Sequence, residues 1–186
     1  MDTKISLCTG HNHKIDNRVL SPFRLWLFKQ MTRWLPESRF FQAKARFLRW
    51  CGARVGNNVR IYSSVNILGS GVLEIADDVH IGPGTRFCIA KSSGIFIGSH
   101  VDIAPEVMII TGSHAINKNT MHIGDSGSAS SIEIGDGSWI CARAVILSGV
   151  QLPTKTVVAA GAVVTKTIDE SGCLLAGCPA IVKKHY

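Results

Sequence analysis

An aliphatic residue recurs at every sixth position between residues 134 and 164, and few folds can accommodate that spacing. A small or β-branched residue stands four positions after each of the first five aliphatics. The aliphatics are Ile134, Ile140, Ile146, Leu152, Val158 and Val164, and their companions are Ser138, Ala144, Val150, Thr156 and Ala162. A helix repeats every ~3.6 residues and a strand every ~2, so neither explains the pattern. A repeat of six is typical of a parallel β-helix with three flat sides, each a short strand and a corner.

The same spacing recurs upstream in three shorter blocks. They consist of Val55, Ile61 and Ile67, of Ile75, Ile81 and Phe87, and of Ile97, Ile103 and Ile109. Three sides return the chain to its starting strand about 4.8 Å further along the axis, so the aliphatics of successive coils stack into internal ladders. We therefore predict a mainly β chain with a solenoid over residues 53–168.

The six-residue rhythm stops after Thr111 and resumes at Ile132. The intervening residues 112–131 are polar and rich in Gly and Ser, and we predict that they leave the solenoid as one excursion loop. A loop of this length in a compact array usually has a function. Residues 169–186 are predicted to form a C-terminal tail.

Residues 1–52 are predicted to form an N-terminal arm and a basic helical cap. His11 and His13 lie in the polar arm, but they lack carboxylate or thiol neighbours and make a poor metal site. Helical spacing indicates one helix from Pro22 to about residue 35 and another over about 38–50. The pair can cover the open first coil, as every solenoid requires. Its basic, aromatic residues 22–50 can also contact an anionic membrane or a polyanionic glycan, and both interpretations stay open.

The net charge of +7 is unevenly distributed. Residues 1–54 hold 11 Lys and Arg against 3 acidic residues, whereas residues 55–186 hold 9 against 10. The solenoid is therefore not basic, and nucleic acid is not an expected partner. The sequence has no long apolar run or signal-peptide pattern, and its six cysteines are scattered. We expect reduced thiols in a cytoplasmic protein, which can also lie at the inner face of the membrane.

His114 stands where the third block ends and the excursion begins, in Thr111-Gly112-Ser113-His114. A histidine at a solenoid corner beside a long polar loop is exposed enough to exchange protons and constrained enough to be positioned. Its position suits a general base that works near neutral pH.

Three segments resemble the hexapeptide-repeat acyltransferases. They are Ile134-Gly135-Asp136-Gly137-Ser138-Trp139-Ile140, Ala160-Gly161-Ala162-Val163-Val164-Thr165-Lys166 and Ala176-Gly177-Cys178-Pro179-Ala180. The resemblance covers residues 52–184 and is closest to sugar O-acetyltransferases of the galactoside, maltose and colanic-acid type. It implies a left-handed β-helix, a homotrimer, and acetyl-CoA held between neighbouring subunits without a metal. It also implies direct acetyl transfer to a sugar hydroxyl, in surface polysaccharide or other glycan biosynthesis.

The resemblance assigns roles to individual residues. His114 matches the catalytic base and Trp139 the aromatic residue along the pantetheine arm. Ala142 matches a backbone N–H that meets the thioester oxygen, and Ala160 a backbone contact to the pantetheine amides. Thr165 and Lys166 match positions at the nucleotide end, where Lys183 and, more loosely, Lys184 supply further charge for the phosphates.

The sequence departs from the family at two positions near the expected acceptor. Gly84 stands where galactoside enzymes have asparagine, and Ala115 follows His114 where the colanic-acid branch often has aspartate. Asp102 is then the nearest carboxylate that could orient the imidazole, and we include it as a catalytic candidate.

Three alternatives remain at this point. The acceptor can be the amino group of a nucleotide sugar or another small molecule, which makes the protein an N-acetyltransferase. A γ-type carbonic anhydrase would need three converging histidines, from the candidates His80, His100, His114 and His122, and these show no close histidine pair. A non-catalytic scaffold would not need His114, Trp139 and Lys166.

Overall fold

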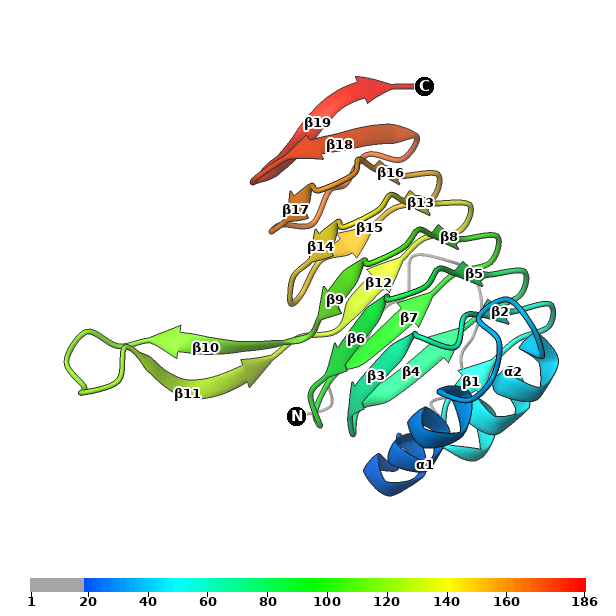
Figure 1. The fold of residues 1–186 in the computed structure, drawn as a ribbon. Helices are drawn as coiled ribbons and strands as arrows, with labels where there is room; N and C mark the ends of the chain where they lie inside the picture. Colours follow the sequence, from blue (N-terminus) through cyan, green and yellow to red (C-terminus); the bar gives the residue numbers. More distant parts are fainter. Residues whose placement is uncertain (1–18) are drawn as a thin grey trace.

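The computed structural model describes residues 19–186, which form a left-handed parallel β-helix with two helices at one end (Figure 1). The predicted arm with His11 and His13 lies almost wholly outside the described residues. Neither helix of residues 19–186 has the length and apolar content that crossing a bilayer requires.

Three sheets form the sides of the solenoid, and we label them A, B and C in the order in which the chain visits them. Sheet A contains β1 (Arg54–Val55), β4 (Val72–Ile75), β7 (Gly94–Ile97), β12 (Ile132–Ile134) and β15 (Gln151–Leu152). Sheet B contains β2 (Arg60–Ile61), β5 (His80–Ile81), β8 (Asp102–Ile103), β13 (Trp139–Ile140), β16 (Val157–Val158), β18 (Cys173–Gly177) and β19 (Ala180–His185). Sheet C contains β3 (Asn66–Gly69), β6 (Arg86–Ile89), β9 (Met108–Ile110), β14 (Val145–Ile146) and β17 (Val163–Val164).

The six-residue pattern is confirmed as the source of the core. Ile140 pairs in register with Ile103 below it and Val158 above it, and all three are buried. The residue before each inward aliphatic points outward, because side chains alternate along a strand. Each fully buried Ile or Val contributes roughly 1.5–3 kcal/mol, so the ladders rather than isolated contacts hold the coils together.

Tight corners separate the sides and require unusual backbone conformations. At the corner between sheets A and B, Asn58, Asp78, His100 and Lys155 have positive φ values of 51°, 58°, 57° and 60°. Gly135 permits a close approach of two coils, since a Cβ there would lie 2.5 Å from the backbone nitrogen of Thr154. The corners therefore stack as regularly as the strands do.

The helices α1 (Pro22–Thr32) and α2 (Phe41–Trp50) pack against the first coil. Pro22 begins α1 as predicted, although the Ser21 side chain makes no capping hydrogen bond. The second helix begins at Phe41 because Phe40 has a left-handed conformation. Leu25 and Phe28 of α1 and Ala45 and Leu48 of α2 are buried and join the solenoid core.

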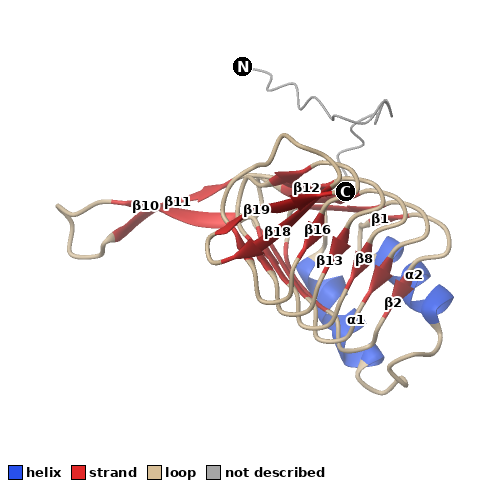
Figure 2. Cartoon of the chain, turned by 90° about the horizontal axis from the view of Figure 1, so that it is seen from above, coloured by secondary structure: helices blue, strands red, loops and turns tan. Residues whose placement is uncertain are grey.

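The segment predicted as an excursion loop is a β-hairpin. Its strands are β10 (Gly112–Ile116) and β11 (Gly124–Ala129), which pair antiparallel and project away from the solenoid (Figures 1 and 2). The predicted tail is also ordered, since β18 continues sheet B beside β16 and β19 returns antiparallel to β18.

Candidate active site

His114 lies on β10 near the base of the projecting hairpin, with its side chain exposed. Its Nδ1 is 3.2 Å from the main-chain carbonyl oxygen of Asp125 on β11. A carbonyl oxygen can only accept a hydrogen bond, so Nδ1 carries the proton. In the neutral ring this leaves Nε2 unprotonated and able to accept a proton from a hydroxyl group.

Buried hydroxyl groups anchor the base of the hairpin. The hydroxyls of Ser93 and Thr111 are 2.6 Å apart, and Ser148 Oγ donates to the Thr111 carbonyl at 2.7 Å. Further out, Asn117 Nδ2 donates to the Asp125 carboxylate at 2.9 Å. The contacts at the base fix both strands and thereby the direction of the His114 ring.

The structure does not place Asp102 where it could orient His114 within one chain. Asp102 points outward from sheet B, and its Oδ1 is 3.8 Å from Nδ1 of His80. The hairpin leaves the solenoid at the corner between sheets C and A, so among residues 19–186 no contact joins Asp102 to His114. The Asp125 carbonyl makes the orienting contact instead. A main-chain carbonyl has no residue-specific signal, which is why the sequence did not indicate it.

Three residues expected to contact acetyl-CoA lie together. Trp139 is exposed on the outer face of sheet B, in register with Val157. Ala142 and Ala160 follow at the corner between sheets B and C, where Gly161 N donates to the Ala142 carbonyl at 2.9 Å. The two alanines thus occupy equivalent corners of adjacent coils, and their backbone groups lie along one edge.

The remaining candidates lie elsewhere on the solenoid. Thr165 and Lys166 are exposed after β17, at the corner between sheets C and A. The His114 hairpin leaves the solenoid at the same corner two coils earlier, after β9. Lys183 is exposed on β19 at the far end of sheet B. Sheet C therefore separates His114 from Trp139, and no one face of a single chain carries both residues.

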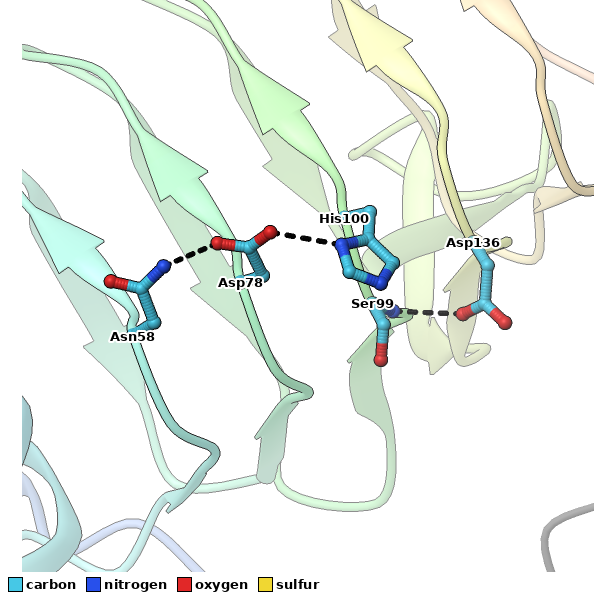
Figure 3. A network of polar contacts seen from close by, with 5 residues as sticks. All are labelled: Asn58, Asp78, Ser99, His100 and Asp136. Carbon is cyan, nitrogen blue, oxygen red and sulfur yellow. Dashed lines mark hydrogen bonds and ion pairs between the residues drawn. The ribbon is translucent and has the colours of Figure 1, made fainter.

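A second polar region lies at the corner between sheets A and B (Figure 3). The amide of Asn58 donates to the carboxylate of Asp78, which is also 2.9 Å from Nδ1 of His100. The hydrogen bonds from His100 and Asn58 hold the pKa of Asp78 below its usual value. In the same network, the Asp136 carboxylate accepts the Ser99 backbone N–H at 2.8 Å.

This network borders a cavity of about 260 Å³ that is otherwise lined by Arg60, His80 and Asp102. Two of the four histidines considered for a carbonic anhydrase lie here, whereas His114 and His122 belong to the hairpin segment. No set of three or more His, Cys, Asp or Glu residues within 19–186 is arranged to hold a metal ion. A larger cavity of about 530 Å³ lies over sheet A, beside Phe96 and Glu133, away from these residues.

Known proteins provide an independent comparison. No family model matches the chain. An Escherichia coli protein named as a colanic acid biosynthesis acetyltransferase, WcaF, is 30% identical over 161 residues, which cover 86% of this chain and 84% of that protein. A galactoside O-acetyltransferase of Lactococcus lactis is 29% identical over 111 residues, 58% of this chain and only 53% of the relative.

Solved structures show the same fold. A hexapeptide-repeat-containing acetyltransferase from Vibrio cholerae superimposes with a TM-score of 0.67 and 22% identity, over 88% of this chain and 89% of that one. A structure of the same Vibrio cholerae protein complexed with acetyl-CoA has a TM-score of 0.62 at the same identity and covers 88% of this chain and 86% of the other.

Proposed function

Because the chain belongs to the hexapeptide-repeat acetyltransferases, we propose that it transfers the acetyl group of acetyl-CoA to a hydroxyl group of a sugar. The observation that carries this proposal is the tautomer of His114. An exposed imidazole whose Nδ1 donates to the Asp125 carbonyl presents a basic Nε2, as a reaction with a neutral hydroxyl requires. The related proteins named for colanic acid and galactosides support a sugar acceptor and a role in glycan biosynthesis.

In the proposed reaction, Nε2 of His114 takes the proton of the acceptor hydroxyl while its oxygen attacks the thioester carbonyl. The Asp125 carbonyl stabilises the imidazolium that forms, because Nδ1–H remains directed at it. Collapse of the tetrahedral intermediate breaks the C–S bond, and the imidazolium returns its proton to the leaving CoA sulfur. The products are an acetyl ester and CoA.

Direct transfer is favoured over a covalent acyl-enzyme. Cys141 adjoins Ala142 and is the cysteine nearest to the expected donor contacts in sequence. Burial raises the pKa of its thiol, which disfavours the thiolate needed for nucleophilic attack. Proton transfer by His114 then suffices for direct acyl transfer from acetyl-CoA to the acceptor within a ternary complex.

The donor site is proposed to lie between two copies of the chain. Trp139 would line the pantetheine arm, the backbone at Ala142 and Ala160 would bind the thioester and amides, and Lys166 would contact a phosphate, with Thr165 and Lys183 nearby. Sheet C separates Trp139 from His114 in one chain, so a site that uses both residues needs a neighbouring solenoid. We propose a homotrimer for this reason.

The outer surface of sheet C suits such an interface. It carries an apolar column, two residues wide, of side chains that are only partly covered in the single chain. One row consists of Met108, Val145 and Val163, and the other contains Leu68, Ile110 and Leu147. An apolar column of this kind on a solenoid side is typical of a surface that packs against another subunit.

The polar cavity beside Asp102 is consistent with a hydroxyl-rich acceptor. Arg60, His80 and Asp102 form one outward row on sheet B, and Trp139 continues this row on the next coil. Groups of both charges can donate to and accept from sugar hydroxyls. In this arrangement Asp102 contacts the acceptor instead of the imidazole.

An assay of acetyl-CoA consumption over sugars, nucleotide sugars and glycan oligomers tests the proposal. We expect an acetylated product with at least one sugar, and a turnover roughly 10²–10⁴-fold lower for His114→Ala. The matched variant Asp125→Ala keeps the main-chain carbonyl, so its turnover should stay far closer to that of the wild type. Near-normal turnover of His114→Ala would remove this residue from the mechanism.

The same product identifies the acceptor atom. Hydroxylamine at mildly alkaline pH cleaves an acetyl ester but leaves an acetamide intact. Loss of the acetyl group from the product supports O-acetylation, whereas its retention supports the N-acetyltransferase alternative on the same fold.

A further inference from the structure

The two N-terminal helices expose large apolar side chains that the catalytic proposal does not use. Trp34 is 87% exposed, Phe23 68%, Phe40 59%, Met31 58%, Trp26 55% and Trp50 47%. We call the outward surface formed by α1, α2 and their connection the cap surface. Three of the four tryptophans of the whole chain lie on it, and the fourth is Trp139.

Helix α1 is apolar on two opposite sides. Leu25, Phe28 and Thr32 face the solenoid and are buried. At about 100° per residue, Phe23 lies almost opposite this buried stripe. Trp26 lies next to Phe23 on the outward side, about 60° away around the helix. The rings of Phe23 and Trp26 stack at 6.1 Å, so the outward side presents a preassembled aromatic patch. A helix that is apolar on both sides usually contacts a second apolar phase.

The cap surface is also strongly basic. Residues 19–50 contain seven Lys and Arg residues, and Glu37 is their one acidic residue. Lys44 is buried and Arg49 donates to the carbonyls of Val55 and Gly56, which leaves five exposed cations. These are Arg24, Lys29, Arg33, Arg39 and Arg46. The Glu37 carboxylate accepts from the backbone and hydroxyl of Ser64, and its single negative charge leaves the surface strongly basic.

The cap surface lies at one end of the solenoid. The helices cover the first coil, while β18 and β19 lie at the opposite end and the His114 hairpin projects sideways between them (Figure 1). A flat surface could therefore meet the cap without covering His114 or Trp139. Contact at the cap surface therefore depends on neither the acceptor nor the reaction.

We propose that the cap surface binds the surface of an anionic lipid bilayer. Aromatic side chains at the level of the headgroups, together with Arg and Lys next to anionic lipids, are the combination that holds peripheral helices at such an interface. The cation of Arg24 already stacks 4.8 Å from the Trp50 ring, so charge and aromatic surface meet at one place. Binding at this end leaves the active site in the aqueous phase near the membrane.

Flotation of the full chain with lipid vesicles tests this proposal. The vesicles are phosphatidylcholine alone, or phosphatidylcholine and phosphatidylglycerol at about 3:1. We expect binding to the anionic vesicles, weak binding to the zwitterionic ones, and a decrease in binding as salt screens the cations. Tryptophan fluorescence should shift to shorter wavelength on binding, since three of the four indoles lie on the cap.

Two double variants separate the contributions. Arg33→Glu/Arg39→Glu should reduce the partition coefficient on anionic vesicles roughly tenfold or more, given about 1 kcal/mol for each cation near the surface. Trp26→Ala/Trp34→Ala should reduce it even at low salt. The matched control is Lys118→Glu/Met121→Ala on the hairpin, which removes one cation and one fully exposed apolar side chain elsewhere and should bind as the wild type does.

Unfolding midpoints establish that each variant is folded. If the tryptophan pair fails this check, Trp34→Ala alone replaces it, since Trp34 is the most exposed of them. Absence of binding to anionic vesicles, or equal binding by the cap variants and the wild type, overturns the proposal. So does binding to a soluble anionic polysaccharide without binding to vesicles, or a change of oligomeric state in the cap variants.

Discussion

His114, the proposed general base, shows how a single main-chain contact can set the tautomer of a side chain. Its position at the end of a repeat block was readable from the sequence, because the rhythm stops three residues earlier. Its tautomer was not readable, because it depends on the Asp125 carbonyl across the hairpin. A carboxylate was the natural expectation for an orienting group, and Asp102 instead lies beside His80.

Lys166 offers a test of the donor site at the level of one side chain. We expect Lys166→Ala to raise the KM for acetyl-CoA roughly 2- to 5-fold, as an exposed cation facing a phosphate would. The effect should be smaller with acetyl-dephospho-CoA, which lacks the 3′-phosphate. Steady-state kinetics with both donors measure the difference, and equal losses on the two would contradict the phosphate contact.

Glu133 gives a pH-dependent prediction for stability. It is partly buried on the outer side of sheet A next to Phe96, and desolvation raises the pKa of its carboxyl group. A raised pKa in the folded state favours folding at low pH, and this contribution is lost as pH rises through the folded-state value. The ionised carboxylate therefore destabilises the protein at neutral pH.

We expect Glu133→Gln to raise the urea midpoint at pH 7 and to leave it nearly unchanged near pH 4, where the carboxyl is largely protonated. Urea unfolding at both pH values checks this. An equal rise of the urea midpoint at pH 7 and at pH 4 would show that the effect comes from packing of the amide and not from removal of the charge.

At the scale of elements, the repeat predicted the strands of the solenoid well because each inward position is decided by burial alone. Ile134, Ile140 and Ile146 are each almost wholly buried on a different sheet, as their spacing requires. The hairpin was predicted as a loop because β11 consists mainly of Gly and Ser, which have weak strand propensity. Its pairing depends on anchoring at Thr111, a tertiary contact that spacing cannot reveal.

Gly135 tests how tightly adjacent coils approach. A Cβ at this position would lie 2.5 Å from Thr154 N and 2.6 Å from the Pro153 carbonyl carbon, and backbone atoms cannot move aside cheaply. Gly135→Ala should therefore lower the free energy of unfolding by roughly 1–3 kcal/mol. In the control Gly127→Ala, no atom lies within 4 Å of the added Cβ, and stability should change little. Urea unfolding monitored by circular dichroism measures the stability of both variants. Similar losses of stability in the two would contradict a close approach of the coils at Gly135.

At the scale of the whole molecule, the separation of His114 from Trp139 is the feature that one sequence could not reveal. The repeat places each residue on one side of the solenoid. Which sides of neighbouring subunits meet depends on packing between copies of the chain. The proposed homotrimer follows from this separation and from the apolar column on sheet C. The family resemblance implied the same assembly from a different line of argument.

The column gives a direct test of assembly. Val145→Glu/Leu147→Glu introduces two charges into the proposed interface, where burying an unpaired carboxylate is costly. We expect smaller species by sedimentation velocity, loss of acetyl transfer, and an unchanged far-ultraviolet circular dichroism spectrum. Gln30→Glu adds an exposed charge on α1 and serves as the control for assembly. A trimer that persists in the double variant would show that the interface lies on another surface.

A stack of parallel coils is in principle endless, since every terminal strand offers unpaired backbone groups to another one. This chain covers the first coil with α1 and α2, and at the other end β19 reverses direction against β18. The strand β19 also exposes the cations Lys183 and Lys184, which repel a like edge. Both devices stop coil-on-coil addition, so the molecule keeps a finite length and is protected from growing into fibrils.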